Sequence, residues 1–122
     1  DLAAKLQKVT SGDPTALPAD QAFAMATILG AQALKMGDQI GSLEVGKRAD
    51  VISIRLDAPN AAPLYNVYSQ LVYSLKASDV GDVMVNGRII VRNRHMLTVD
   101  DKAVLAKAEE YRAKVAKSLA GN

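Results

Sequence analysis

The sequence pattern with the clearest chemical meaning is Gly41-x-x-x-x-Gly46-Lys47, in the stretch GSLEVGKRADVISI. The same spacing occurs in phosphate-binding loops, where backbone N–H groups and a lysine hold the phosphates of a nucleotide. Those loops need Ser or Thr after the lysine as a Mg²⁺ ligand, but this chain has Arg48 there. They also need a strand before the glycines and a helix after them, whereas the order predicted here is helix, turn, strand. We therefore interpret Gly41 and Gly46 as turn residues that supply backbone freedom.

Metal chemistry has little support in the residue types. The chain has one histidine, His95, and no cysteine, so it offers neither thiolate ligands nor a histidine cluster. No regularly spaced carboxylate accompanies His95 to complete a catalytic site. We therefore expect His95 to be a surface or partly packed side chain.

The remaining polar candidates are also better explained as structure. Asp100-Asp101 and Glu109-Glu110 fall on a predicted helix, where neighbouring side chains diverge by about 100° and do not converge on one substrate. None of the serines lies in a Gly-x-Ser-x-Gly elbow. Lys47-Arg48 is expected to form a local ion pair with Asp50 or to hold the turn, with binding of a substrate anion as the alternative. We predict no catalytic, cofactor-binding or metal-ligating residue in this chain.

Composition and charge exclude several classes of partner. The apolar fraction is 49%, typical of a chain that packs a core, although only 4% of the residues are aromatic. The formal net charge is +2 and there is no basic run, which argues against nucleic acid and anionic membranes. No apolar run approaches the roughly 20 residues that span a bilayer, and the N-terminus has no signal-peptide pattern. With no cysteine present, these features lead us to expect a cytoplasmic protein.

The spacing of apolar residues predicts two helical regions near the N-terminus. The first covers Asp1–Val9, and the second begins at Pro18, a residue suited to the first helical position, and continues through Ala33. Gly30 is expected to mark a break or a close helix contact, and Gly37 to be the left-handed C-terminal cap. Small side chains would let this region approach a neighbour closely: Ala22, Ala26, Ala31 and Ala33.

Residues typical of β-structure predict three strands. Asp50–Leu56 is rich in β-branched residues and precedes a loop bracketed by prolines. Asp82–Val85 and Arg88–Val91 flank Asn86-Gly87, the pair favoured in type I′ turns, and are predicted to form a hairpin. Residues 65–75 repeat apolar side chains every four positions, which favours a helix, with a strand as the alternative.

The last part of the chain is predicted to be helical. Asn93-Arg94 is expected to end the second hairpin strand or to start another turn, and Val99–Leu119 shows helical spacing. Thr98 and Asp101 resemble a capping box at its start. Three strands with a single hairpin leave unpaired edges. Because the chain also begins in helical register at Asp1, without an initiator Met, we expect it to be cut from a longer protein.

Three longer stretches resemble the amidohydrolase superfamily. IGSLEVGKRADVISIRLD, at Ile40–Asp57, is similar to the segment that leaves the metal-dependent (β/α)₈ barrel of that superfamily and enters a small β-sandwich. DPTALPADQAFAMATILGAQAL, at residues 13–34, is similar to the last helical region of the barrel, with Phe23 where Leu is usual. VYSQLVYSLKASDVGDVMVNGRIIVRNRHMLTVD, at residues 67–100, resembles the deaminase and chlorohydrolase branch.

The resemblance implies an α/β fold in which this chain supplies one end of a larger enzyme. Residues 1–40 would be terminal helices of the barrel. Residues 41–98 would be C-terminal strands and the hairpin of a composite β-sandwich with an inserted helix, and residues 99–122 a C-terminal helix. The strands would pair with N-terminal strands absent from this sequence, which would account for their free edges.

The same resemblance implies hydrolytic deamination of a purine-type substrate, such as methylthioadenosine or S-adenosylhomocysteine, with zinc or another divalent metal. The implied metal ligands, a His-x-His pair, two later histidines and an aspartate, lie upstream of the position that Asp1 matches. His95 matches none of them, so the resemblance assigns no site residue and predicts an inactive chain. The implied partners are the missing N-terminal portion, a small-molecule substrate and a second copy of the enzyme. The alternatives are a chlorohydrolase-type relative, a free-standing interaction or nucleotide-binding module that uses Gly41–Arg48, and a structural subunit.

Overall fold

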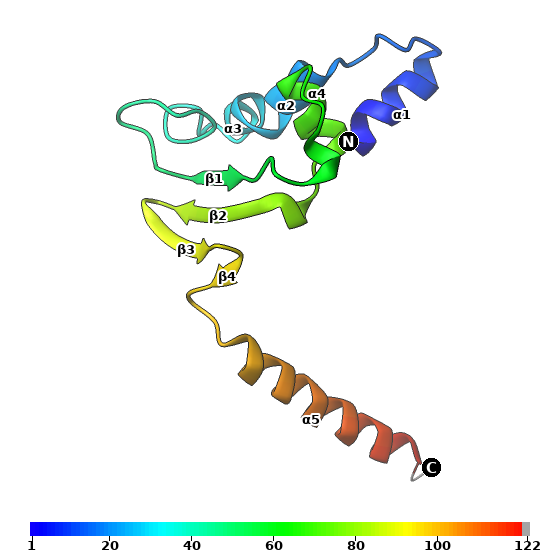
Figure 1. Ribbon diagram of the computed structural model, residues 1–122, viewed down its shortest axis with the longest axis vertical. Coiled ribbons are helices and arrows are strands. Elements are labelled where there is room, and N and C mark those ends of the chain that lie inside the picture. The colour runs from blue at the N-terminus through cyan, green and yellow to red at the C-terminus, as the bar shows by residue number, and fades with distance from the viewer. Residues whose placement is uncertain (121–122) are drawn as a thin grey trace.

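The structure, a computed structural model, describes residues 1–120 of the chain. Its helical elements α1 to α4 lie on one side of a four-stranded antiparallel sheet, and a long helix, α5, extends away from the opposite side (Figure 1). The observed class is therefore helices plus an antiparallel sheet. The last two residues of the predicted C-terminal segment, 121 and 122, lie outside the described residues.

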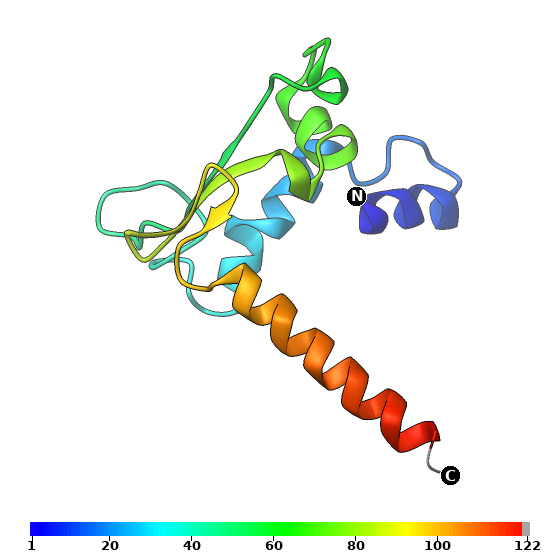
Figure 2. The ribbon, with the colours of Figure 1, turned by 60° about the horizontal axis from the view of Figure 1, so that its bottom comes forward.

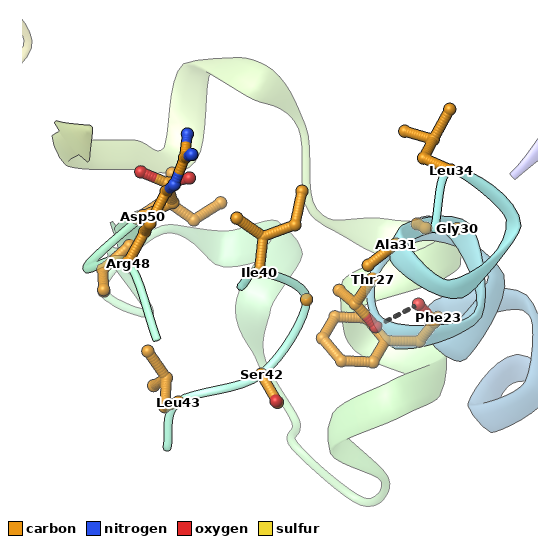
Figure 3. A pocket seen from close by; sticks show the side chains of 14 residues that line it. Phe23, Thr27, Gly30, Ala31, Leu34, Ile40, Ser42, Leu43, Arg48 and Asp50 are labelled. Carbon is orange, nitrogen blue, oxygen red and sulfur yellow. Dashed lines mark hydrogen bonds between the residues drawn. The ribbon is translucent and has the colours of Figure 1, made fainter. Parts of the chain in front are cut away.

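The N-terminal region folds into three short helices: α1 (Leu2–Ser11), α2 (Ala19–Ala26) and α3 (Ile28–Ala33). α1 ends at Gly12, which has a left-handed φ of 68°. Pro18 was predicted at the first helical position but is the N-cap of α2, with an extended backbone of φ −64° and ψ 165°, so the helix begins one residue later, at Ala19. α2 and α3 are separated at Thr27, whose φ of −127° and ψ of −105° are not helical. The Thr27 hydroxyl donates a 2.9 Å hydrogen bond to the carbonyl oxygen of Phe23, as shown in Figure 3.

The two predictions about glycines in this region have different outcomes. At Gly30 the close helix contact is confirmed, because a Cβ there would lie 2.7 Å from the carbonyl oxygen of Met25 in α2; the alternative, a break at Gly30, is wrong because the helix breaks at Thr27. The prediction of Gly37 as the left-handed cap is wrong, because the left-handed residue is Lys35, with φ of 58°. Met36 N–H donates to the carbonyl of Ala31 and Lys35 N–H to that of Gln32, the Schellman pattern. The left-handed cap therefore falls two residues earlier than predicted, on a lysine.

The sheet has the strand order β1-β2-β3-β4, with every neighbouring pair antiparallel. The strands are β1 (Val51–Ile54), β2 (Val80–Val85), β3 (Arg88–Arg92) and β4 (His95–Met96). The predicted hairpin is confirmed: Asn86 and Gly87 have φ of 49° and 79°, and Val85 pairs with Arg88. Asn93-Arg94 forms a second tight turn, with φ of 48° and 66°, that leads into β4. The prediction of three strands missed β4, because two residues are too few for a periodic signal.

Short helical segments connect β1 to β2: η1 (Pro59–Ala61), α4 (Val67–Ser69), the π-helical η2 (Gln70–Ser74) and η3 (Ala77–Asp79). The prediction of a helix over the Val- and Tyr-rich stretch is thus confirmed, and the strand alternative is wrong. Asp79 is buried and accepts hydrogen bonds from the backbone N–H of Lys76 at 2.7 Å and from the Asn60 amide at 2.8 Å. These two bonds, led by the one from Lys76, lower the pKa of Asp79. The carboxylate of Asp79 therefore connects η1 to the start of η3, two of the segments between β1 and β2.

α5 (Asp101–Ala120) stands apart from the rest of the chain (Figures 1 and 2). The carboxylate of Asp100 caps its start, accepting from the N–H groups of Lys102 at 2.9 Å and Ala103 at 3.1 Å. The prediction of a capping box that starts at Thr98 is therefore wrong. The N-cap is Asp100, the residue directly before the first helical residue. None of the helices within residues 1–120 combines the length and apolar character needed to cross a membrane.

The core is thin for a chain of this size. The buried residues of the described part are small or polar: Ala4, Ala31, Ala61, Asp79 and Gly81. The accessible surface is 9262 Å². A compact monomer of 12.9 kDa would expose about 6,300 Å². The chain thus exposes about 3,000 Å² beyond that expectation.

Candidate functional site

An apolar groove of about 740 Å³ lies between α2–α3 and the segment that runs from Ile40 into β1 (Figure 3). Phe23, Thr27 and Leu34 approach it from the helices, and Leu43 and Arg48 from the other side. The complete lining is Phe23, Ala26, Thr27, Gly30, Ala31, Leu34, Ile40, Gly41, Ser42, Leu43, Arg48, Asp50, Val51 and Ile52. We name this concavity the return groove.

Gly41 sets the closest contact in the return groove. Its φ is 93°, and a Cβ built there would lie 2.7 Å from the Cβ of Ala31 and 2.9 Å from the Cα of Ile28. Only glycine lets the chain touch α3 at this point. Gly46 has nearly the same φ, 94°, but no atom lies within 4 Å of a Cβ placed there. The first glycine therefore serves packing and the second serves only the turn.

Lys47 is engaged inside this turn. Its ammonium donates to the hydroxyl of Ser42 at 2.6 Å and to the carboxylate of Glu44 at 3.3 Å, and its side chain is only 11% exposed. The hydrogen bond from Ser42, and next that from Lys47, lowers the pKa of Glu44. Lys47, the lysine that would bind a phosphate in a nucleotide-binding loop, is thus bound within its own turn. A strand follows the turn, where a nucleotide-binding loop would have a helix. Of the two structural roles predicted for Lys47-Arg48, an ion pair with Asp50 or stabilisation of the turn, Lys47 has the second.

Arg48 and Asp50 also have structural partners, and the predicted ion pair with Asp50 does not form. The Arg48 guanidinium donates to the side-chain oxygen of Gln39 at 2.8 Å, and the Arg48 backbone N–H donates to the Gln39 carbonyl at 2.8 Å. Asp50 accepts a 2.6 Å hydrogen bond from the backbone N–H of Asn86 instead. Both side chains therefore hold the segment between Ile40 and β1 in place at the rim of the return groove.

The titratable side chains form no metal centre in the part of the chain that the structure describes. Within residues 1–120 no group of three or more His, Cys, Asp or Glu side chains could hold a metal ion. His95 is exposed on β4, and its Nδ1 lies 2.9 Å from the carbonyl oxygen of Asn93. A carbonyl only accepts, so Nδ1 carries the proton and the ring is turned toward its own hairpin. The absence of site residues in this chain stays a prediction.

The predicted acidic pairs have structural roles on α5. Asp100 is the helix cap, Glu109 forms an ion pair with Arg112, and Glu110 lies between Lys107 and Lys114. Sequence reasoning missed the return groove itself. Its one signal was the run of alanines on the second helical region, two of which, Ala26 and Ala31, line the groove.

Comparisons with known proteins relate nearly the whole chain to larger enzymes. Residues 1–90 match the Amidohydrolase family. A 5-methylthioadenosine/S-adenosylhomocysteine deaminase from Desulforudis audaxviator is 47% identical over 117 residues, which are 96% of this chain and 27% of that protein. An adenosine deaminase from Xanthomonas campestris, crystallised with zinc, superposes with a TM-score of 0.86 at 39% identity, covering 94% of this chain and 26% of that one. A zinc-bound atrazine chlorohydrolase from Arthrobacter aurescens superposes with a TM-score of 0.72 at 25% identity, covering 88% and 25%. The chain thus spans about a quarter of the length of the relatives it matches.

Proposed function

This chain belongs to the amidohydrolase family, and from that premise we propose that it is the C-terminal part of a hydrolase that deaminates a purine-type substrate such as methylthioadenosine or S-adenosylhomocysteine. The observation that carries the proposal is the 47% identity to a deaminase of these substrates, sustained over 96% of the chain. The net reaction replaces the amino group on a purine ring carbon with oxygen from water and releases ammonia.

The proposed enzyme uses zinc or another divalent metal, in keeping with the zinc bound to two structural relatives. The residues described here do not fit such an ion, because no suitable cluster of His, Cys, Asp or Glu occurs among residues 1–120. We therefore assign the metal and all the chemistry to the part of the parent enzyme outside this chain. The contribution of this chain is structural.

In this proposal residues 1–40 belong to the barrel, residues 41–98 to the small sandwich, and residues 99–122 to the C-terminal segment that contains α5. The return groove receives apolar side chains from the remainder of the enzyme. β1 is hydrogen-bonded to β2 on one side only within the described sheet, so its other edge would pair with strands from that remainder. The groove and the edge lie on the same stretch of chain, which supports one continuous docking surface.

A chlorohydrolase-type activity is the second candidate, because the atrazine chlorohydrolase shares the fold of this segment. The higher identity and TM-score of the deaminases favour deamination. We further propose that the parent is a cytoplasmic homo-oligomer, and light scattering of the purified parent would measure its oligomeric state.

Split-enzyme complementation tests the proposal. The 122-residue chain and the rest of its parent are produced separately, assayed for ammonia release from methylthioadenosine with zinc, and then mixed. We expect neither part to be active alone, and activity to return on mixing because the return groove and the β1 edge regain their partners. A triazine substrate in parallel tests the chlorohydrolase candidate. Full activity of the larger part alone, or stoichiometric zinc binding by the 122-residue chain, would contradict the proposal.

A further inference from the structure

The turn at Asn86-Gly87 is held by two hydrogen bonds that its N–H groups donate to the segment before β1. The backbone N–H of Asn86 donates to a carboxylate oxygen of Asp50 at 2.6 Å, and the N–H of Gly87 donates to the carbonyl oxygen of Ala49 at 3.0 Å. The two central residues of a hairpin turn lie outside the ladder, so their N–H groups need other partners. Residues 49 and 50 supply both, and we call this arrangement the turn clasp.

The second turn of the sheet has the same arrangement. The N–H of Asn93 donates to a carboxylate oxygen of Asp82 at 2.9 Å, and the N–H of Arg94 donates to the carbonyl oxygen of Gly81 at 2.8 Å. In both turns a carbonyl and the next residue's aspartate bind consecutive N–H groups of two positive-φ residues. The hydrogen bond from Asn93, followed by one from Ser53, lowers the pKa of Asp82. The two clasps differ mainly in the residue after asparagine, which is glycine in one and arginine in the other.

An Asn-Gly pair can deamidate through a cyclic imide, a reaction that is much slower at Asn-Arg. The backbone nitrogen of Gly87 can attack the side-chain amide carbon of Asn86, because glycine has no Cβ to hinder the approach. The new N–C bond closes a five-membered imide as the bond to the side-chain nitrogen breaks, and ammonia leaves with the proton of the Gly87 N–H. Water then opens the imide to aspartate or isoaspartate.

We propose that Asn86 is a deamidation site of this protein and that the turn clasp controls its rate. The attacking nitrogen is the one whose N–H is bound to Ala49, and the neighbouring bond to Asp50 holds Asn86 at a φ of 49°. Both bonds must open before the ring can close. Asn86 and Gly87 are exposed, so water and base reach the turn once it opens.

The product would not regain the clasp. A carboxylate at position 86 would belong to the residue whose own N–H binds the carboxylate of Asp50, and like charges on such close groups repel. Isoaspartate also adds a backbone atom to a two-residue turn whose register pairs Val85 with Arg88. Deamidation would therefore detach the hairpin from the β1 segment, and the change is irreversible.

Peptide mapping of the full-length parent by mass spectrometry, with isoaspartate quantified, tests the proposal. During incubation at mildly alkaline pH we expect slow conversion of Asn86 in the native protein, fast conversion in urea, and little conversion of Asn93 in either state. Asp50→Ala should accelerate native conversion of Asn86 about tenfold, in line with the net effect of one or two hydrogen bonds. Asp50→Asn keeps an acceptor oxygen and should restore most of the protection.

Asp82→Ala is the matched control, because it opens the equivalent clasp on the other turn and should leave the rate at Asn86 unchanged. Equal rates for Asn86 in native and urea-unfolded wild-type protein would overturn the proposal even if every variant failed to fold. An Asp50→Ala rate equal to that of the wild type, or conversion of Asn93 as fast as that of Asn86, would overturn it as well.

Discussion

At the scale of single residues, Gly41 and Gly46 share a backbone conformation but differ in their surroundings. Their φ values are 93° and 94°, a region in which any L side chain is strained. Only at Gly41 would an added Cβ collide with another element, at 2.7 Å from Ala31. Gly46 is therefore required only for the backbone conformation of the turn, whereas Gly41 is also required for packing in the return groove.

Alanine at each glycine should show this separation. We expect Gly46→Ala to lower the free energy of unfolding of the parent by about 1–2 kcal/mol, the cost of a left-handed backbone in a residue with a Cβ. Gly41→Ala should cost about 1–3 kcal/mol more, because its methyl overpacks the contact with α3. Urea unfolding measures both values. Equal losses would show that Gly41 has no packing role.

At the scale of elements, α5 is held by contacts within itself. Glu110 accepts hydrogen bonds from Lys107 at 2.7 Å and Lys114 at 2.6 Å, and both ammonium groups lie over the ring of Tyr111 at 5.2 and 5.5 Å. The bond from Lys107, followed by that from Lys114, lowers the pKa of Glu110 below its ordinary value of 4.5. Such pairs at spacings of three and four stabilise a helix even without tertiary contacts.

The helicity of a peptide covering residues 99–120 should therefore depend on pH. The pKa of Glu110 is lowered in the helix, so its stabilising effect is complete above the pKa of the unfolded chain, near 4.5, and is lost as pH falls through the lower helical value. We expect circular dichroism to show helicity falling on acidification below about 4.5. Glu110→Gln should reduce helicity at neutral pH and flatten this acid transition.

Glu109→Gln is the graded control for that measurement, because Glu109 pairs only with Arg112 among the described residues. Its loss should be smaller than that of Glu110→Gln, and high salt should diminish both effects. A wild-type peptide whose helicity does not change with pH would rule out the proposed role of the ion pairs.

At the scale of the whole molecule, the apolar side of α5 is exposed and lacks a neighbour to pack on among the described residues. Its large apolar side chains are all exposed: Val104, Leu105, Tyr111, Val115 and Leu119. Most of them fall on one stripe at helical spacing, the arrangement of a helix that packs on a neighbour. Together with the return groove and the free edge of β1, this stripe accounts for part of the surplus of about 3,000 Å² of exposed surface. A surplus of that size matches an obligate interface.

The isolated 122-residue chain is therefore expected to expose a surface that the rest of the parent enzyme would cover. It should bind a hydrophobic dye such as ANS and associate with itself, because exposed apolar surface and an open strand edge both favour aggregation. Addition of the rest of the parent should suppress dye fluorescence and give a defined mass by light scattering. A monodisperse monomer without dye binding would be inconsistent with this expectation.

Local signals fixed most of the elements in advance. Asn86-Gly87 between two β-type runs predicted the hairpin, and Gly12 and Pro18 act at the helix ends where their backbone preferences require them. These features depend on neighbours in sequence, so the sequence contains the information. The caps predicted at Gly37 and Thr98 were wrong because several neighbouring residues could cap each helix and the fold selects one of them. β4 was missed because two residues are too few for a periodic signal.

By itself, then, the sequence determined the type of most elements, the structural character of the Gly-Lys motif and the family of the parent enzyme. The tertiary structure alone decided that Gly41 packs on α3, that Lys47 is bound within its own turn, and that Asp50 and Asp82 clasp two turns. The longest of these contacts in sequence joins Asp50 and Asn86, which are 36 positions apart, so their distance in space follows from packing and not from local preference.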